Sequence, residues 1–173
     1  MALAAGVVAG CALVRGPDDV DRALRARRLM VPMAGVEPDQ VPDTFDERRD
    51  GGGRRHGALD IPAPRGTLVV SADDGTVLAV RSSRLGGRTL YAPDPDRRFV
   101  YYYAHLDRHR PGLRQGTALA RGQVLGDVGT TGNAPHGAPH LHFQVMVWPD
   151  DGRWWDGRPI DPRPFLVMPG AAR

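Results

Sequence analysis

An alternating stretch near the C-terminus constrains the fold of this chain most strongly. Between positions 140 and 148, apolar side chains occupy every second position: Leu141, Phe143, Val145 and Val147. Residues two apart in a β-strand point to the same face, so these four side chains form one apolar face. His140, His142 and Gln144 share the opposite face. The pattern predicts a strand that packs one face on a core and presents two imidazoles on the other.

Other short apolar runs also predict strands, because turn residues separate them. The chain contains 22 glycines and 16 prolines, which favours a turn-rich β protein over a helical one. The predicted strands cover residues 67–72, 76–81, 89–91, 99–104, 123–129 and 140–148. We expect the first two to pair as a hairpin through the turn Asp73-Asp74-Gly75. The residues thus predict one mostly antiparallel β domain.

Two segments before these strands differ in character. Residues 17–29 predict a short helix with acidic residues first and arginines last, as the helix dipole prefers. We interpret it as a solvated linker helix. Residues 35–55 predict a long loop rich in Gly, Pro, Asp and Arg, which is typical of functional or disordered segments. The expected organisation is an N-terminal segment and helix (1–30), a main domain (31–168) and a tail (169–173).

The N-terminal residues predict export. Residues 2–14 form an apolar run that is shorter than the roughly 20 residues of a membrane-spanning helix but fits a secretion signal. Within it, Val8-Ala9-Gly10-Cys11 resembles a bacterial lipoprotein box, in which Cys11 would be lipidated and attach the protein to a membrane. A plain apolar tail is the alternative. Because Cys11 is the only cysteine, an intramolecular disulfide is excluded.

All 23 basic residues are arginines, and the formal net charge is +3. The codon bias of a GC-rich genome accounts for this composition. The alternative is weak attraction to an anionic polymer, either a cell envelope or a nucleic acid. We predict no nucleic-acid binding, because no recognised alternation of aromatic and basic residues accompanies the arginines.

The six histidines all lie between positions 56 and 142, which suggests a chemical site. His56 and Asp60 are four residues apart and converge on one metal ion if the chain bends at Gly57. Two histidines and a carboxylate form a Zn²⁺ ligand set that leaves a coordination position for water, as catalytic sites do. Two further histidines near that water would serve as general base and as stabiliser of an oxyanion. These residue types suit amide hydrolysis.

Four sequence blocks occur in an order and spacing typical of one family. The blocks are His56-x-x-x-Asp60, Tyr103-Ala104-His105-Leu106, Gly132-Asn133 and Pro139-His140-Leu141-His142-Phe143. Through them, the chain from about Pro32 to Leu166 resembles the LytM/lysostaphin-type zinc metallopeptidases. The segments 60–67 and 121–126 are similar to the two β segments of that family.

The resemblance implies a two-layer antiparallel β-sheet domain with a central groove and one Zn²⁺ at its floor. It implies that His56, Asp60 and His142 are the metal ligands, and that His105 and His140 are catalytic. It further implies hydrolysis of peptide bonds in bacterial peptidoglycan, by a protein of the cell envelope, periplasmic or extracellular. We expect a monomer. The cleaved bond stays open between the D-alanyl–diaminopimelate cross-link and glycine-containing bridges.

Three residues depart from the family pattern or lie outside it, and the role of a fourth, Tyr103, is open. Gln144 stands where many relatives have Glu, so a carboxylate that would orient a ligand histidine is replaced by a neutral amide. His109 and His136 belong to no block, and we expect both in loops, with His136 a candidate to line the groove. Tyr103 is either a groove hydrogen-bond donor or a packed strand residue.

Two other functions use similar residues. A non-haem iron(II) oxygenase has the same ligand types, but its first histidine and carboxylate are usually two apart, and it leaves the His140-x-His142 pair unexplained. A catalytically silent adaptor of the same fold would activate other wall hydrolases. Such adaptors typically lose metal ligands, whereas this chain retains His56, Asp60 and His142.

Overall fold

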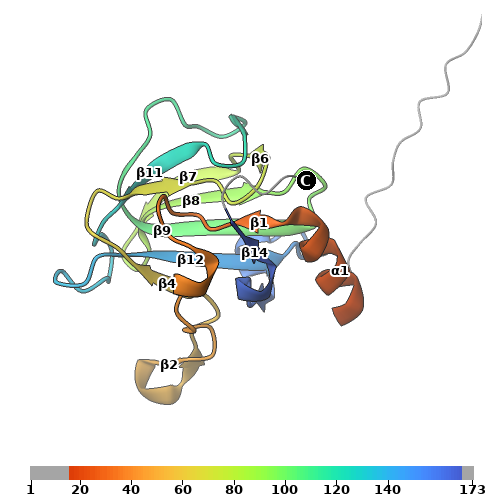
Figure 1. The fold of residues 1–173 in the computed structure, drawn as a ribbon, viewed down its shortest axis with the longest axis horizontal. Helices are drawn as coiled ribbons and strands as arrows, with labels where there is room; N and C mark the ends of the chain where they lie inside the picture. The colour runs from red at the N-terminus through yellow and green to blue at the C-terminus, as the bar shows by residue number, and fades with distance from the viewer. Residues whose placement is uncertain (1–15, 169–173) are drawn as a thin grey trace, which may run out of the picture.

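The structure is a computed structural model that describes residues 16–168, and it is mostly β (Figure 1). Its one α-helix is α1 (Pro17–Arg27), and four short 3₁₀ turns are η1 (Pro38–Gln40), η2 (Asp50–Gly52), η3 (Trp154–Asp156) and η4 (Arg163–Phe165). The strands are β1 (Leu29–Met30), β2 (Arg48–Arg49), β3 (Arg54–Arg55), β4 (Leu59–Pro62), β5 (Leu68–Val70), β6 (Gly75–Thr76), β7 (Ala79–Ser83), β8 (Gly87–Pro93), β9 (Phe99–His109), β10 (Ala118–Leu119), β11 (Val124–Val128), β12 (His140–Val147), β13 (Pro159–Ile160) and β14 (Leu166–Val167).

Strand β9 is the centre of the main sheet. The strands follow the order β13-β12-β9-β11-β5, with β4 paired to the free part of β12 and the β7–β8 hairpin on the other edge of β9. All of these pairs are antiparallel. The small pair β1–β14 is parallel, and β10–β6 and β2–β3 are antiparallel. The predicted mostly antiparallel β architecture is confirmed.

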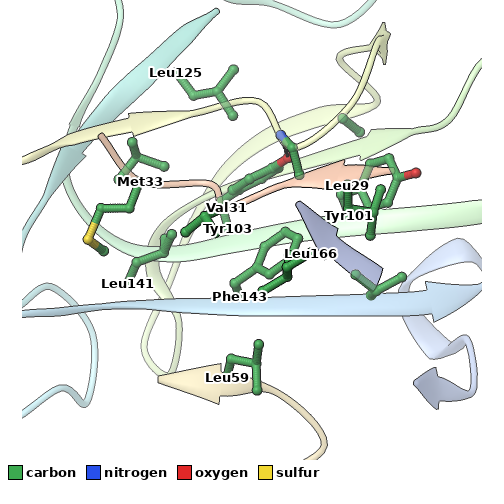
Figure 2. Packing of buried hydrophobic residues seen from close by; sticks show 14 of the residues in the cluster. Leu29, Val31, Met33, Leu59, Tyr101, Tyr103, Leu125, Leu141, Phe143 and Leu166 are labelled. Carbon is green, nitrogen blue, oxygen red and sulfur yellow. Dashed lines mark hydrogen bonds between the residues drawn. The ribbon is translucent and has the colours of Figure 1, made fainter. Parts of the chain in front are cut away.

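The core lies between this sheet and the segments that cross it. Figure 2 shows side chains from β1, β9, β12 and β14 meeting in one cluster. Tyr101 and Tyr103 of β9 and Leu141 and Phe143 of β12 are all at most 1% exposed. Burial therefore alternates from His140 to Val145 as the sequence predicts, with Leu141, Phe143 and Val145 buried and the histidines and Gln144 partly accessible. At the end of the strand the alternation stops, because Met146 is also buried and Val147 is partly exposed. This alternation directs both histidines away from the core.

The N-terminal helix belongs to the same core, which corrects the interpretation as a solvated linker. Val20, Ala23 and Leu24 are buried in the cluster, and α1 contacts η4. Arg27, in the last turn of the helix, forms ion pairs with Asp73 and Asp94 of the β domain. The acidic-to-basic gradient predicted the helix, but the few apolar residues of this short segment did not show that a partner surface exists.

The predicted hairpin between residues 67–72 and 76–81 is wrong. β5 pairs with β11 instead, and the second segment divides into β6, which pairs with β10, and β7, which pairs with β8. The apolar pattern identifies the strands because it reports burial. It contains no information on which non-adjacent strand completes the hydrogen-bond ladder.

The segment 35–55 is more ordered than the predicted loop. It contains η1 and a hairpin formed by β2 and β3 around η2. The hairpin extends from the lower part of the molecule in Figure 1. The main chain of His56 and Gly57 donates hydrogen bonds to the carbonyl groups of Glu47 and Phe45, at 2.8 and 2.9 Å. These bonds attach the base of the hairpin to the first candidate ligand.

The segment with Cys11 lies outside the described residues. Among residues 16–168, no helix is both long and apolar enough to span a membrane.

Candidate metal centre

Two paired strands and the turn before them bring three candidate ligands together. Asp60 of β4 is the direct register partner of His142 of β12. His56 precedes β4 and reaches the same point because Gly57 adopts a positive φ of 69°, which glycine tolerates without strain. One ligand atom from each of the three residues lies within 4.8 Å of the others. The structure thus assembles the predicted set, His56, Asp60 and His142.

One carboxylate oxygen is at the centre of this cluster. Asp60 Oδ1 lies 2.9 Å from His142 Nδ1 and 3.1 Å from His56 Nε2. The two histidine nitrogens are 3.1 Å apart. Burial alone would raise the pKa of the Asp60 carboxyl, but its close contacts with His142 and His56 hold that pKa well below the usual range. Burial lowers the pKa of His142. A metal ion requires its ligands in this state, with the carboxyl group ionised and the imidazole neutral.

The donor set fits Zn²⁺, which accepts imidazole nitrogen and carboxylate oxygen. His56 Nδ1 donates a hydrogen bond of 2.8 Å to the carbonyl oxygen of Thr44, which leaves Nε2 as the ligand atom. The Thr44 hydroxyl accepts a hydrogen bond of 2.9 Å from the main-chain N–H of Asp60. A single residue of the preceding segment therefore holds two of the three candidate ligands.

His105 enters the groove through a local break in the strand pattern. At this residue β9 changes partner from β12, which pairs up to Ala104, to β11, which pairs from Leu106. His105 has a positive φ of 60°. Strict alternation would direct His105 to the buried face of Tyr103. Instead, Ala104 and His105 both line the groove, and Leu106 returns to the core.

His105 and His140 form a second pair beside the ligands. Their ring centroids are 4.9 Å apart. His105 Nδ1 donates to the carbonyl oxygen of Thr131 and His140 Nδ1 to that of Ala138, each at 2.8 Å. Both Nε2 atoms are therefore unprotonated in the neutral rings and are available as acceptors. His140 Nε2 lies 3.7 Å from Asp60 Oδ1.

Burial is the main cause that lowers the pKa of His105 to about 4, and the neighbouring His142 and His140 lower it further. The hydrogen bond to Thr131 opposes this shift. His105 is thus neutral throughout the physiological range, as a proton acceptor must be.

These side chains line one cavity of about 500 Å³. Its walls are contributed by the β2–β3 hairpin, the turn between β7 and β8, and the loop at residues 133–135. Tyr102 and Arg49 also line it and were missed by the sequence patterns. Tyr102 was detectable, since it is two residues before Ala104 on the same strand face. Arg49 was not, because arginines are frequent throughout this chain.

The remaining expectations have mixed outcomes. Tyr103 is fully buried, and its hydroxyl accepts a hydrogen bond from the Ala72 N–H, so it is a core residue. Among the described residues, Gln144 forms no hydrogen bond with a histidine. Its amide donates to the Gly57 carbonyl oxygen at 3.0 Å and so supports the turn between two ligands. His136 is exposed, and His109 is on β9 rather than in a loop. Neither lines the cavity.

The fold and the site together define a β-sheet protein with a groove and a candidate metal centre of the catalytic type. A family model described as Peptidase family M23 matches residues 54–162, and the chain belongs to this family. The resemblance to LytM/lysostaphin-type peptidases is thereby confirmed.

Named relatives agree with this assignment. The L-Ala–D-Glu endopeptidase of Bacillus subtilis is 35% identical over 130 residues, which are 71% of this chain and 38% of that protein. The catalytic domain of lysostaphin from Staphylococcus simulans is 27% identical, with a TM-score of 0.62 over 74% of this chain and 93% of that one. A zinc-containing peptidase from Vibrio cholerae is 30% identical, with a TM-score of 0.55 over 69% of this chain and 33% of that one. The chain therefore spans less than half the length of the Bacillus relative.

Proposed function

We propose that this chain is a zinc-dependent endopeptidase that hydrolyses peptide bonds in the stem peptides or cross-bridges of bacterial peptidoglycan. The observation that carries the proposal is the convergence of His56 Nε2, Asp60 Oδ1 and His142 Nδ1. A second pair of histidines stands directly beside them in an accessible cavity. The names of the relatives, among them an L-Ala–D-Glu endopeptidase and a zinc-containing peptidase, support the substrate and the metal.

The ligand set and the histidine pair would divide the chemistry. Zn²⁺ held by His56, Asp60 and His142 would supply Lewis acidity for the scissile carbonyl and for water. The Nε2 atom of His105 or of His140, both of which line the cavity, accepts the proton that the attacking water loses. An imidazole that has gained this proton donates a hydrogen bond to the oxyanion, or returns the proton to the leaving amine.

The surroundings of the pair favour this division of roles. The Thr131 and Ala138 carbonyl groups hold the two Nδ1–H groups, so the rings cannot exchange tautomers without losing a hydrogen bond. Tyr102 lies at the groove with its ring centroid 5.9 Å from that of His142. It provides an aromatic wall against which an extended peptide packs.

Location and assembly are part of the proposal. A substrate in the cell wall requires a protein of the cell envelope, periplasmic or extracellular, with Cys11 as the candidate point of membrane attachment. We propose that the protein acts as a monomer.

The decisive experiment measures metal and activity together on the purified full chain. We expect near-stoichiometric zinc by elemental analysis, and its loss in His142→Ala. His140→Ala should retain zinc and lose hydrolysis of purified peptidoglycan, measured by mass analysis of the released peptides. His109→Ala, a histidine outside the cavity, is the matched control and should retain both.

Each alternative predicts a different outcome. Iron in place of zinc would support the oxygenase. Absence of metal after zinc reconstitution would contradict the peptidase and leave the adaptor as the explanation. The masses of the released peptides identify the cleaved bond among the stem and cross-bridge candidates.

A further inference from the structure

Arg49, in the β2–β3 hairpin, forms an ion pair with the candidate metal ligand Asp60. Its Nη2 lies 2.7 Å from Asp60 Oδ2 and 3.0 Å from Glu47 Oε2. The Asp60 side chain is 22% exposed and that of Arg49 34%. This contact is short and charge-assisted, in a partly shielded position, and is therefore stronger than an ordinary surface pair.

The two oxygens of Asp60 have separate partners. Oδ1 faces the histidines, with His142 Nδ1 at 2.9 Å and His56 Nε2 at 3.1 Å. Oδ2 faces Arg49. The Arg49 guanidinium is also 3.3 Å from His56 Nδ1, the ring atom opposite to the candidate ligand atom. Arg49 thus contacts the Asp60 oxygen that does not face the histidines, from the hairpin wall of the cavity.

The hairpin holds Arg49 in this position. Arg49 pairs with Arg54 across the β2–β3 ladder, and both residues line the cavity. The base of the hairpin is hydrogen-bonded to the main chain of His56 and Gly57 through the Glu47 and Phe45 carbonyl groups. Main-chain hydrogen bonds therefore connect the hairpin that carries Arg49 to the turn that carries His56.

We propose that Arg49 is a positioning residue, which holds Asp60 Oδ2 so that only Oδ1 is presented to the metal. The inference rests on the proposed zinc site. A carboxylate that presents one oxygen leaves room for water and substrate, whereas a carboxylate that turns to present both would occupy that room. A guanidinium is suited to this task because its donors are planar and fixed in direction.

Charge repulsion alone gives the opposite expectation for zinc affinity. A cation near a dication repels it, so removal of the Arg49 charge alone would tighten zinc binding. Loss of an orienting partner of a ligand typically weakens metal affinity by about 10- to 100-fold. The direction of the change in affinity therefore distinguishes a positioning role from a charge effect.

The test is a zinc titration of the full chain in competition with a chromophoric chelator. We expect Arg49→Gln to weaken zinc binding by about tenfold or more, and Arg49→Lys, which keeps a donor and the charge, to lose less. Arg54→Gln is the matched control. Arg54 lines the same cavity and pairs with Asp50 at 3.1 Å rather than with a ligand, so its affinity should match the wild type.

A second measurement reports the coordination itself. X-ray absorption of the zinc-loaded proteins should show an additional oxygen ligand in Arg49→Gln but not in Arg54→Gln. Thermal unfolding of the metal-free variants verifies that each is folded. Equal or tighter zinc binding by Arg49→Gln would overturn the inference while leaving the zinc site intact. Failure of the wild type itself to bind zinc would instead contradict the proposed function.

Discussion

At the scale of single residues, His105 shows how one backbone dihedral directs a side chain. Its φ of 60° lies at the point where β9 exchanges β12 for β11. The left-handed conformation costs a residue with a Cβ about 1–3 kcal/mol and is retained where neighbouring structure enforces it. Here the enforcing contacts are hydrogen bonds from the His105 N–H to Gly86 and from Nδ1 to Thr131.

The low pKa of His105 has a measurable effect on stability. Its folded pKa is about 4 against an ordinary value of 6.5, so between these values the unfolded chain binds a proton that the native protein does not. The free energy of unfolding of the metal-free protein should therefore fall as the pH is lowered from 6.5 to 4. Denaturant titrations at several pH values measure this slope.

The comparison is with His105→Asn, since asparagine tolerates positive φ. The variant should show a shallower loss of stability over the same pH range. An unchanged slope would mean that His105 titrates near its ordinary value. Imidazole signals followed by NMR in the metal-free protein provide a direct check.

At the scale of elements, the turn before β8 and the turn after β11 pack against each other so closely that no side chain fits at Gly132. Gly132 has a φ of 78°, and a Cβ there would lie 2.3 Å from the Gly87 nitrogen and from the Leu85 carbonyl oxygen. Because backbone atoms form both contacts, side-chain rotation cannot relieve them. The turns before β8 and after β11 are thus held together, and both provide hydrogen-bond acceptors for His105.

We expect Gly132→Ala to destabilise the protein and to reduce peptidoglycan hydrolysis while zinc binding persists. The left-handed strain alone contributes about 1–3 kcal/mol, and the clash adds to it. Gly112→Ala is the control, because Gly112 also has a positive φ, of 86°, but a Cβ at this position would have no atom within 4 Å. It should reproduce the strain without loss of activity, and equal effects in both variants would contradict the importance of the contact.

The helix α1 yields a prediction of the same scale. Leu24 is fully buried in the common core. Leu24→Ala should lower the free energy of unfolding by about 2–5 kcal/mol, as for buried leucines in general. Arg22→Ala, at a side chain that is 77% exposed, should change it by less than about 0.5 kcal/mol. Chemical denaturation measures the free energy of unfolding of both variants. A small effect of Leu24→Ala would restore the interpretation as a solvated linker.

At the scale of the whole molecule, Arg27 joins the helix to the β domain through buried charges. Its side chain is 12% exposed, while those of Asp73 and Asp94 are fully buried. Its distances to these carboxylates are 3.2 and 3.5 Å. The Tyr101 hydroxyl, which is also buried, donates to Asp73 at 3.0 Å. The network connects α1, β9 and the segment that follows β5.

Removal of the cation should therefore be costly. Arg27→Met leaves two buried carboxylates without their main counter-charge, and we expect a loss of about 3–5 kcal/mol in the free energy of unfolding. Arg25→Met, which removes an exposed guanidinium paired with Asp21, should change stability little. Similar results for the two variants would show that the buried pairs contribute no more than the surface pair.

The sequence by itself predicted the longer strands and the candidate residues of the site. The alternation at 140–147 reports burial on one face, and burial is a local consequence of hydrophobicity. The His56-x-x-x-Asp60 and His140-x-His142 spacings, within a region that contains all six histidines, indicated a metal or catalytic site. The resemblance to the family then implied which of these residues are ligands and which are catalytic, a choice that strand geometry could not make.

Only the tertiary structure decided which strands pair, where His105 points and what supports the ligands. Strand pairing depends on contacts between residues far apart in the chain, as the separation of β5 from β7 shows. The direction of His105 depends on a change of partner strand that leaves no mark in its own residues. Arg49 is one arginine among 23, and nothing in its sequence neighbourhood distinguishes it from the others. Its contact with Asp60 follows from the fold of the hairpin, because an ion pair depends on the distance between two groups in space.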